Sequence, residues 1–357
     1  MARRFLIPLF AAAIAVCIGY WLMRREPLPV PVPQGATEYS AASATPEPRP
    51  PRGRSQQASE SMDGAEAVKP VGSLVEQWLA GRNRTAGNLL AAFRVTDDTN
   101  YLHAAAAEFP NDPMVQLAIL SGDFFPNDRR LWLDRFREST PAKSLANYLS
   151  AEDYLKQGRT NDAIAEFLAG SEKAELGGST LESMIDLESL ARAMGMSDLD
   201  SAQASISAMS GELMPQFRNF KVLSQGMKSV SESLVMAGDV SSAQNVAHRG
   251  FIVSQQLRHS ESGKLLITQM VADSLEANAI AGLEQDQAYD FLDGRSPAEL
   301  ARALRDKKAS NQELTRQAMT LLPTLSESEF KAYLDRLKVY GEMPAMRWLV
   351  EQKQSAN

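Results

Sequence analysis

The chain has 357 residues and a formal net charge of −7, and 44% of its residues are hydrophobic. This length suits two ordinary domains or one extended repeat array, and the hydrophobic fraction is sufficient for a core. The acidic balance argues against a general nucleic-acid binder, which needs a basic face. The only cysteine is Cys17, so the sequence after it excludes disulfides, thiolate catalysis and cysteine-ligated zinc.

Residues 1–25 contain an uncharged run from Phe5 to Met23 with an arginine pair on each side. A helix of this length roughly spans the hydrocarbon core of a bilayer. We expect an uncleaved transmembrane signal-anchor, because a cut after Ala15 would leave an apolar stub on the mature protein. A cleaved leader, which would give a secreted soluble protein, and a lipoprotein anchored through Cys17 are the alternatives.

The arginine pairs bear on the orientation of this predicted anchor. The pair before the apolar run favours export of the body across the inner membrane, whereas the pair after it opposes export. We therefore expect a single-pass inner-membrane protein, held in the membrane through residues 5–23, with its body on the periplasmic side.

Residues 26–70 are rich in proline, with serine, alanine, glutamine and glycine between the prolines. Such a composition predicts a disordered, semi-extended linker. At roughly 3 Å per residue, it could hold a domain on the order of 100 Å from the membrane. Arg49, Arg52 and Arg54 could contact anionic headgroups or a cell-wall polymer, but a solvated linker is the favoured interpretation.

From Val71 onward, apolar residues recur at helical spacing and no stretch alternates long enough to predict a strand. Glycine-containing turn signals separate these apolar segments, as in helical hairpins. The pattern predicts an all-α fold.

The clearest hairpin is predicted between Leu145 and Gly170. Leu145, Tyr148 and Tyr154 share one side of a first helix, which Gly158 ends because glycine readily adopts the left-handed conformation. Asn161 is expected to cap the second helix. Ala163 is small enough to allow close approach of the two helices, and Phe167 continues the apolar face.

This stretch resembles a tetratricopeptide repeat in residue type and spacing. The matching residues are Ala151, Tyr154, Gly158, Ala163 and Phe167. Asn147 replaces the bulky residue of the pattern, and Gly177-Gly178 stands where a proline is usual. The resemblance implies antiparallel hairpins stacked as a solenoid whose concave face binds peptide or helix segments.

Weaker signals of the same kind lie on both sides of this hairpin. A degenerate hairpin is predicted from Leu89 to Phe109, and helices are expected to begin at Pro113 and Pro141. The same glycine spacing recurs downstream in Leu234, Gly238 and Ala243. These signals predict a helical-repeat domain over residues 71–260, with an irregular helical bundle as the alternative.

Residues 261–357 are predicted to form a C-terminal helical cap that closes the solenoid. The pattern indicates a helix from Lys264 to Ala281 and a second helix opening at Pro297. Ser326 and Glu329 have the spacing of a capping box, and Pro344 is expected to open a short last helix through Trp348.

The sequence offers no catalytic constellation. His103, His248 and His259 do not have metal-ligand spacing, and the chain contains no glycine-rich phosphate loop, GxSxG or CxxC motif. We therefore predict no catalytic residue, no bound metal and no cofactor.

A segment from Phe124 to Phe136 interleaves aromatic residues with arginines and could form the wall of a binding groove. The candidate partner-binding residues are Arg129, Arg130, Trp132 and Arg135. The alternative places Leu131, Trp132 and Phe136 in the core and the arginines in solvent.

These features predict a non-enzymatic, membrane-anchored scaffold or adaptor of a bacterial envelope complex. Its expected partners are other envelope proteins or peptide segments, and not nucleic acid. An envelope enzyme or its regulatory subunit, with a site among acidic residues of 261–357, is the alternative from another class.

Overall fold

The computed structural model describes residues 71–122, 124–178 and 181–355. Over these ranges the chain is all-helical, as predicted, with α-helices α2 to α15, four short 3-10 helices, and no β-structure beyond an isolated bridge between Lys143 and Glu175. The anchor predicted at 1–25 and the linker predicted at 26–70 lie outside the described residues. Within the described ranges, every helix is too short or too polar to cross a bilayer.

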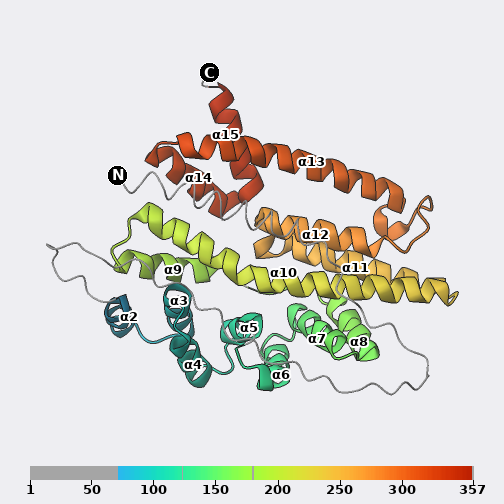
Figure 1. Ribbon diagram of the computed structural model, residues 1–357, viewed down its shortest axis with the longest axis horizontal. Coiled ribbons are helices and arrows are strands. Elements are labelled where there is room, and N and C mark those ends of the chain that lie inside the picture. The colour runs from blue at the N-terminus through green and yellow to red at the C-terminus, as the bar shows by residue number, and fades with distance from the viewer. Residues whose placement is uncertain (1–70, 123, 179–180, 356–357) are drawn as a thin grey trace, which may run out of the picture.

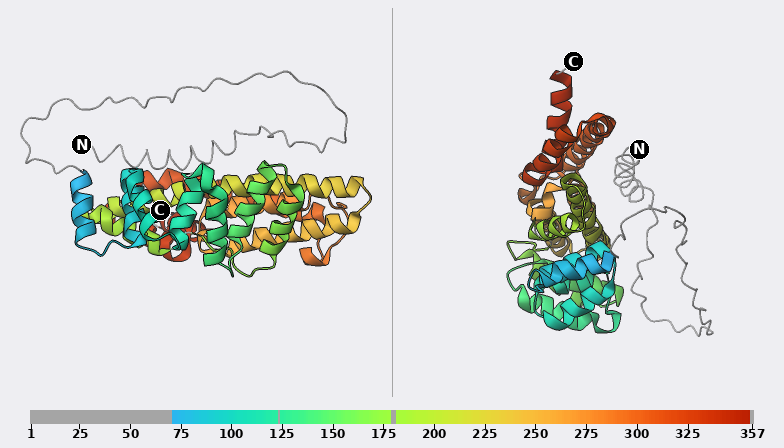
Figure 2. Two further views of the ribbon diagram at one scale, coloured as in Figure 1. Left: turned by 90° about the horizontal axis from the view of Figure 1, so that it is seen from below. Right: turned by 90° about the vertical axis from the view of Figure 1, so that its left-hand side faces the viewer.

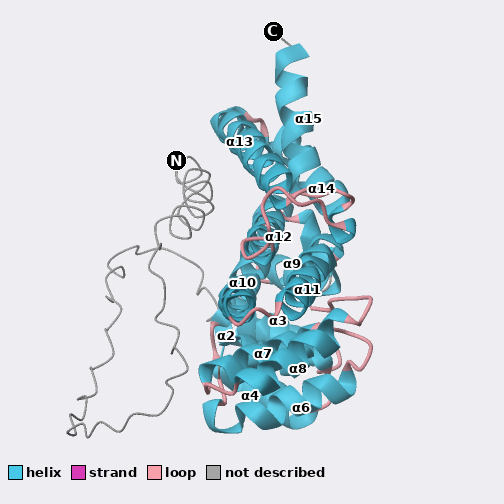
Figure 3. Ribbon diagram, turned by 90° about the vertical axis from the view of Figure 1, so that its right-hand side faces the viewer, coloured by secondary structure: helices cyan, strands magenta, loops and turns pink. Residues whose placement is uncertain are grey.

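The helices form three tiers, which are seen along the molecule in Figure 1 and end-on in Figure 3. The lower tier is a row of short helices. They are α2 (Val71–Ala80), α3 (Ala86–Thr96), α4 (Thr99–Glu108), α5 (Pro113–Gly122), α6 (Arg129–Ser139), α7 (Leu145–Lys156) and α8 (Thr160–Ser171), with η2 (Pro126–Asp128) before α6.

The middle tier is built around one long helix, α10, which runs along most of the body (Figure 1). Helix α10 has 39 residues, whereas α7 and α8 have 12 each, so α10 is more than three times as long. The members of this tier are α9 (Leu181–Ala193), α10 (Asp198–Met236), α11 (Val240–His259), η3 (Glu261–Lys264) and α12 (Leu266–Ala279).

The upper tier lies on the other side of the middle tier (Figure 3). It consists of η4 (Asp290–Leu292), α13 (Pro297–Leu321), η5 (Leu322–Thr324), α14 (Glu327–Tyr340) and α15 (Glu342–Ser355). Two of its helices start with reciprocal capping boxes, at Ser296 and Glu299 for α13 and at Ser326 and Glu329 for α14. The second of these was predicted from the sequence, and it is confirmed.

The hairpin predicted at Leu145–Gly170 is α7 and α8, and its turn is left-handed at Gly158, with φ 72°. The predicted cap at Asn161 is wrong, because α8 begins one residue earlier, at Thr160, and Arg159 occupies the N-cap position. The α10–α11 turn is built in the same way, with φ 81° at Gly238 and the Asp239 side chain accepting from Ser242 N at 3.1 Å.

The predicted helix starts at the prolines have different outcomes. Pro113 opens α5, as expected, whereas the start predicted at Pro141 is wrong. Pro141 lies in a loop, because the chain after α6 runs beside residue Glu175 and α7 begins only at Leu145. The last helix also begins before Pro344, at Glu342, and extends to Ser355 rather than ending near Trp348.

One apolar core joins the lower and middle tiers. Leu89 of α3, Leu117 of α5 and Tyr148 of α7 belong to the same cluster as Leu257 of α11 and Leu275 of α12. The domain boundary predicted at residue 260 falls inside this cluster. A second cluster joins the upper tier to the body, since Ala202, Ile206 and Leu266 pack with side chains of α13, α14 and α15.

Most helices of the lower tier contact the middle tier, including α2 against α9 and α8 against α11. The helices α5 and α7 pack against α10, and α3 packs against α9. Helices α3, α5 and α7 are the first helices of successive hairpins, the ones that would line the concave face of a tetratricopeptide array. In this structure their inner side is therefore covered by the chain's own helices.

Candidate functional site

A groove of about 790 Å³ lies between the lower and middle tiers. Its volume lies in the range of ligand-binding clefts in proteins. Four segments line it. They are the start of α5 (Pro113, Met114, Leu117), the end of α6 and the loop after it (Phe136, Ser139, Thr140, Pro141, Ala142, Lys143), the loop after α8 (Ala174 to Gly178) and the end of α11 with η3 (Gln256, His259, Ser260, Glu261, Ser262).

The floor of the groove is apolar. Leu117, Phe136 and Leu176 are almost completely buried and belong to the main core, and Met114 packs against them at the edge. An apolar side chain of a ligand could cover the apolar surface of this hollow. Removing such surface from water is favourable.

Two loops joined by an isolated parallel bridge between Lys143 and Glu175 form one wall. Ser144 N donates to Glu175 O at 2.9 Å and Leu145 N donates to Leu176 O at 2.9 Å. The side chains of Lys143 and Glu175 form an ion pair above this short ladder. Gly177 has φ 81°, and a Cβ there would lie 3.0 Å from the Lys143 Cβ, so the close approach of the loops depends on glycine.

A buried glutamine joins this wall to the middle tier. Gln256 Oε1 accepts from Tyr148 Oη at 2.5 Å and from Ser144 Oγ at 3.2 Å. Its Nε2 donates to Gly170 O at 3.4 Å and to Lys173 O. Burial raises the pKa of the Tyr148 phenol, so the hydroxyl remains a neutral donor. These contacts hold α11 at a set distance from α7 and α8 and so determine the depth of the groove.

The rim of the groove carries mixed polar groups rather than a catalytic cluster. His259 and Glu261 are exposed there. No set of three or more His, Cys, Asp or Glu side chains within the described ranges is arranged to hold a metal ion. The other histidines pack on rings elsewhere, His103 at 5.0 Å from Phe125 and His248 at 4.8 Å from Phe291.

The predicted partner-binding residues divide into two pairs. Arg129 and Trp132 face inward: the Arg129 side chain is 14% exposed and lies 3.4 Å from an Asp153 carboxylate oxygen, and Trp132 is 6% exposed. Arg130 and Arg135 remain partly exposed. The alternative prediction is right for Trp132 and Phe136, which are in the core, and wrong for Leu131, which is 48% exposed.

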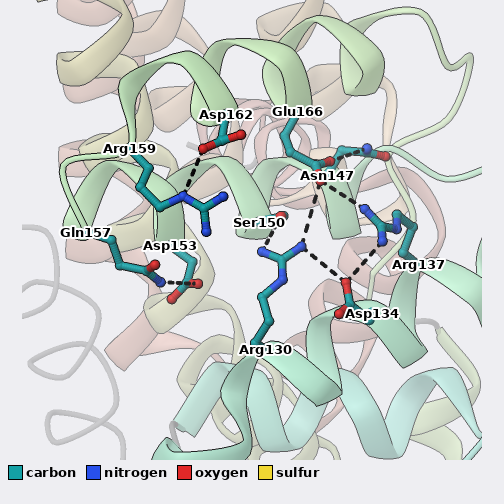
Figure 4. A network of polar contacts seen from close by, with 10 residues as sticks. All are labelled: Arg130, Asp134, Arg137, Asn147, Ser150, Asp153, Gln157, Arg159, Asp162 and Glu166. Carbon is teal, nitrogen blue, oxygen red and sulfur yellow. Dashed lines mark hydrogen bonds and ion pairs between the residues drawn. The ribbon is translucent and has the colours of Figure 1, made fainter.

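Arg130 belongs to a charged network across α6, α7 and α8 (Figure 4). It donates to Ser150 Oγ at 2.8 Å, and both Arg130 and Arg137 meet Asp134 Oδ1, at 3.1 and 3.0 Å. Arg137 also reaches Glu166 Oε1 at 2.9 Å. These cations already have carboxylate partners, so the network ties the three helices together.

The residues predicted to pack the repeats occupy buried faces and turns. Those buried between helices are Leu145, Tyr148, Ala151, Ala163, Phe167 and Ala243. Tyr154 and Leu234 are partly buried against the main core. Gly158 and Gly238 form the two left-handed turns. Arg130 and Arg159 lie over the Tyr154 ring at 4.5 and 4.3 Å from its centroid.

Sequence reasoning missed the groove and Gln256. Gln256 bonds to residues 83 to 112 positions away in the chain, and no local pattern marks such a contact. The glycine pair at 177 and 178 was visible as a turn signal, but its role in bringing two loops together was not.

Comparison of the chain with protein-family models, with curated proteins and with solved structures gives no match.

Proposed function

We propose that this protein is a non-enzymatic scaffold of a bacterial envelope complex, anchored in the membrane through residues 5–23, and that it binds an extended peptide segment of a partner in the groove. The lower tier is then a degenerate tetratricopeptide-like array. Its hairpins α3–α4, α5–α6 and α7–α8 follow one another along the row (Figure 1).

The groove is the observation that carries this proposal. It has an apolar floor and a wall of two paired loops, and the ion pair between Lys143 and Glu175 is already formed. Such a lining favours a ligand that contributes apolar side chains and backbone hydrogen-bonding groups over a highly charged ligand. An extended peptide has these properties.

The proposed binding site differs from the concave face of a tetratricopeptide array. That face is packed against α9 and α10 here, and displacing α10 would expose core residues such as Phe217, Phe220 and Leu223. No residue of α9 or α10 lines the groove, so a ligand bound there would leave α10 in place.

The position of α2 suits a tether. The described body begins with α2 at one end of the row, so a membrane anchor and a long linker would enter there (Figure 2). The groove lies between α5, the two loops and α11, further along the body. A partner could therefore reach the groove without passing the tether.

The test is a crosslinking pull-down of the full-length protein from its native membranes, comparing variants that fill the groove. Ala142 and Ala174 are exposed lining residues, so Ala142→Trp or Ala174→Trp would place a ring in the hollow without disturbing the core. Ala80→Trp, at the exposed end of α2, is the matched control. We expect the same specific partners with wild type and control, and their loss with both groove variants.

Retention of every partner by both groove variants would contradict the proposal. Substitutions are preferable to deletion of residues 71–260, because that deletion would remove α10 and α11 from the cores that also hold α12 and the upper tier.

A further inference from the structure

A second surface lies in the upper tier and shares no lining residue with the groove. Arg336, Val339 and Tyr340 are exposed on one face of α14, at positions three and four residues apart. Val339 and Tyr340 are each 60% exposed, among the most exposed large hydrophobic side chains of the described body. Trp348, on α15, lies beside them and is partly buried against the upper-tier core.

Arg336 is held between two aromatic rings. Its guanidinium carbon lies 5.2 Å from the centroid of Tyr340 and 5.1 Å from that of Trp348. Stacking of this kind restricts the side chain while leaving the N–H groups at the edge of the guanidinium plane accessible. The Arg336 side chain therefore loses less conformational entropy on binding a ligand than an unstacked arginine would lose.

Other stacked arginines differ from Arg336. Arg159 and Arg130 lie over Tyr154, but they pair with Asp162 and Asp134. Within the part of the chain that the structure describes, the Arg336 side chain has neither an ion pair nor a hydrogen bond. Its guanidinium is therefore held in place by the two rings, and its N–H groups are available to a ligand.

Further stacked arginines, Arg82 and Arg135, each lie over the ring of a single buried tryptophan, Trp78 or Trp132. Arg336 differs from both because it lies between two rings and beside two exposed apolar side chains. Tryptophan, tyrosine and arginine are also the residues most enriched where binding energy concentrates in protein interfaces.

We propose that this surface, formed by Arg336, Val339, Tyr340 and Trp348, docks an acidic amphipathic segment of a partner protein. A carboxylate of that segment pairs with the edge of the Arg336 guanidinium, and an apolar side chain beside it covers Val339 and Tyr340. Arginine recognises carboxylates with two parallel N–H···O bonds, for which a stacked guanidinium is suitably arranged.

The local charge favours a single carboxylate over a polyanion. Helices α14 and α15 carry five basic side chains, Lys331, Arg336, Lys338, Arg347 and Lys353, and five acidic ones, Glu327, Glu329, Asp335, Glu342 and Glu351. Nucleic acid and anionic lipid surfaces instead select clusters of basic residues. The surface is therefore suited to a protein segment.

The test measures binding of a fluorescently labelled amphipathic peptide, in which glutamate recurs beside leucine, to the full-length protein in nanodiscs. A peptide with glutamine in place of each glutamate is the control ligand. We expect the glutamate peptide to bind about ten-fold more tightly than the glutamine peptide. Arg336→Lys should remove most of this difference, since lysine keeps the charge but not the planar fork.

Control variants separate this surface from the rest of the protein. Arg82→Lys alters a stacked, exposed arginine in another tier and should leave binding unchanged. The groove variant Ala174→Trp should bind the glutamate peptide as wild type does, so failure of the groove proposal would not affect this one. Tyr340→Ser should weaken binding of both peptides.

Several results would overturn the inference. These are absence of binding, equal affinity for the two peptides, or an equal loss in Arg82→Lys and Arg336→Lys. Binding confined to anionic vesicles would show a membrane contact instead. Concentration-dependent self-association that Arg336→Lys removes, without peptide binding, would show an interface between copies of this chain.

Discussion

Replacement of Gln256 by methionine should destabilise the protein strongly, although residue size and apolar packing are nearly kept. The side chain of Gln256 is buried and joins α11 to both α7 and α8. Without it, Ser144 Oγ can still donate to Glu175 O at 3.2 Å, but the Tyr148 hydroxyl and Lys173 O lose the partners described above. Each buried polar group left unpaired costs about 1 to 3 kcal/mol, so we expect a loss of about 2 to 4 kcal/mol.

The hydrogen bond between Tyr148 and Gln256 can be isolated in a double-mutant cycle. Tyr148→Phe alone should cost about 1 kcal/mol, because Gln256 Oε1 keeps its bond from Ser144. In the double variant no hydroxyl is left unpaired. Its unfolding free energy should therefore fall by about 1 kcal/mol less than the sum of the decreases in the two single variants. The assay is urea unfolding followed by circular dichroism.

Gln255→Met is the matched control, on the same helix and one residue away, with a side chain that is only partly buried. Its effect should stay within about 0.5 kcal/mol. Additive losses in the cycle, or an equal effect of the control, would refute the view that this hydrogen bond couples the two tiers.

Three further predictions concern local structure and pH. Gly158→Ala should lower the unfolding free energy by about 1 kcal/mol, because φ is 72° at this position. Gly72→Ala, in helix α2 with open space around it, should be neutral or stabilising. Equal effects of the two substitutions in urea unfolding would contradict this. Ser296→Ala should cost about 1 kcal/mol through loss of the α13 capping box, and an unchanged melting temperature would argue against it. Burial raises the pKa of the Glu342 carboxyl, which accepts from Leu266 N at 2.8 Å. The folded state therefore holds this proton more tightly than the unfolded state does, so the group stabilises the fold at low pH and this contribution is lost as pH rises above about 4.5. Glu342→Gln should gain stability relative to wild type as pH increases through that window, and a pH-independent difference between the two proteins would be inconsistent with this reasoning.

Local signals in the sequence predicted much of the helical structure. Gly158 and Gly238 form left-handed turns, Pro113 opens α5, and Ser326 with Glu329 caps α14. These features depend on a few neighbouring residues, and their physics is independent of the rest of the fold. Pro141 shows the limit of such reasoning, because a contact with a loop some thirty residues away keeps that proline outside a helix.

The candidate binding surfaces were less accessible to sequence reasoning. Arg129 and Arg130 are adjacent in an arginine-rich segment, yet the Arg129 side chain is 14% exposed and that of Arg130 is 34% exposed. Which face of α6 meets α7 determines that difference. Trp348 was visible only as a residue near the end of a predicted helix, and its proximity to Arg336 depends on how α15 packs beside α14.

By itself, the sequence determined that the body is helical, where its best-marked hairpins turn and how several helices begin. Helical periodicity, glycine conformation and capping are short-range effects, so they can be read along the chain. Only the tertiary structure decided that α10 fills the inner side of the lower tier, that Gln256 joins the tiers, and that a groove remains between them. Those outcomes depend on which apolar faces pack against one another and exclude water. Such packing joins residues that are far apart in the sequence.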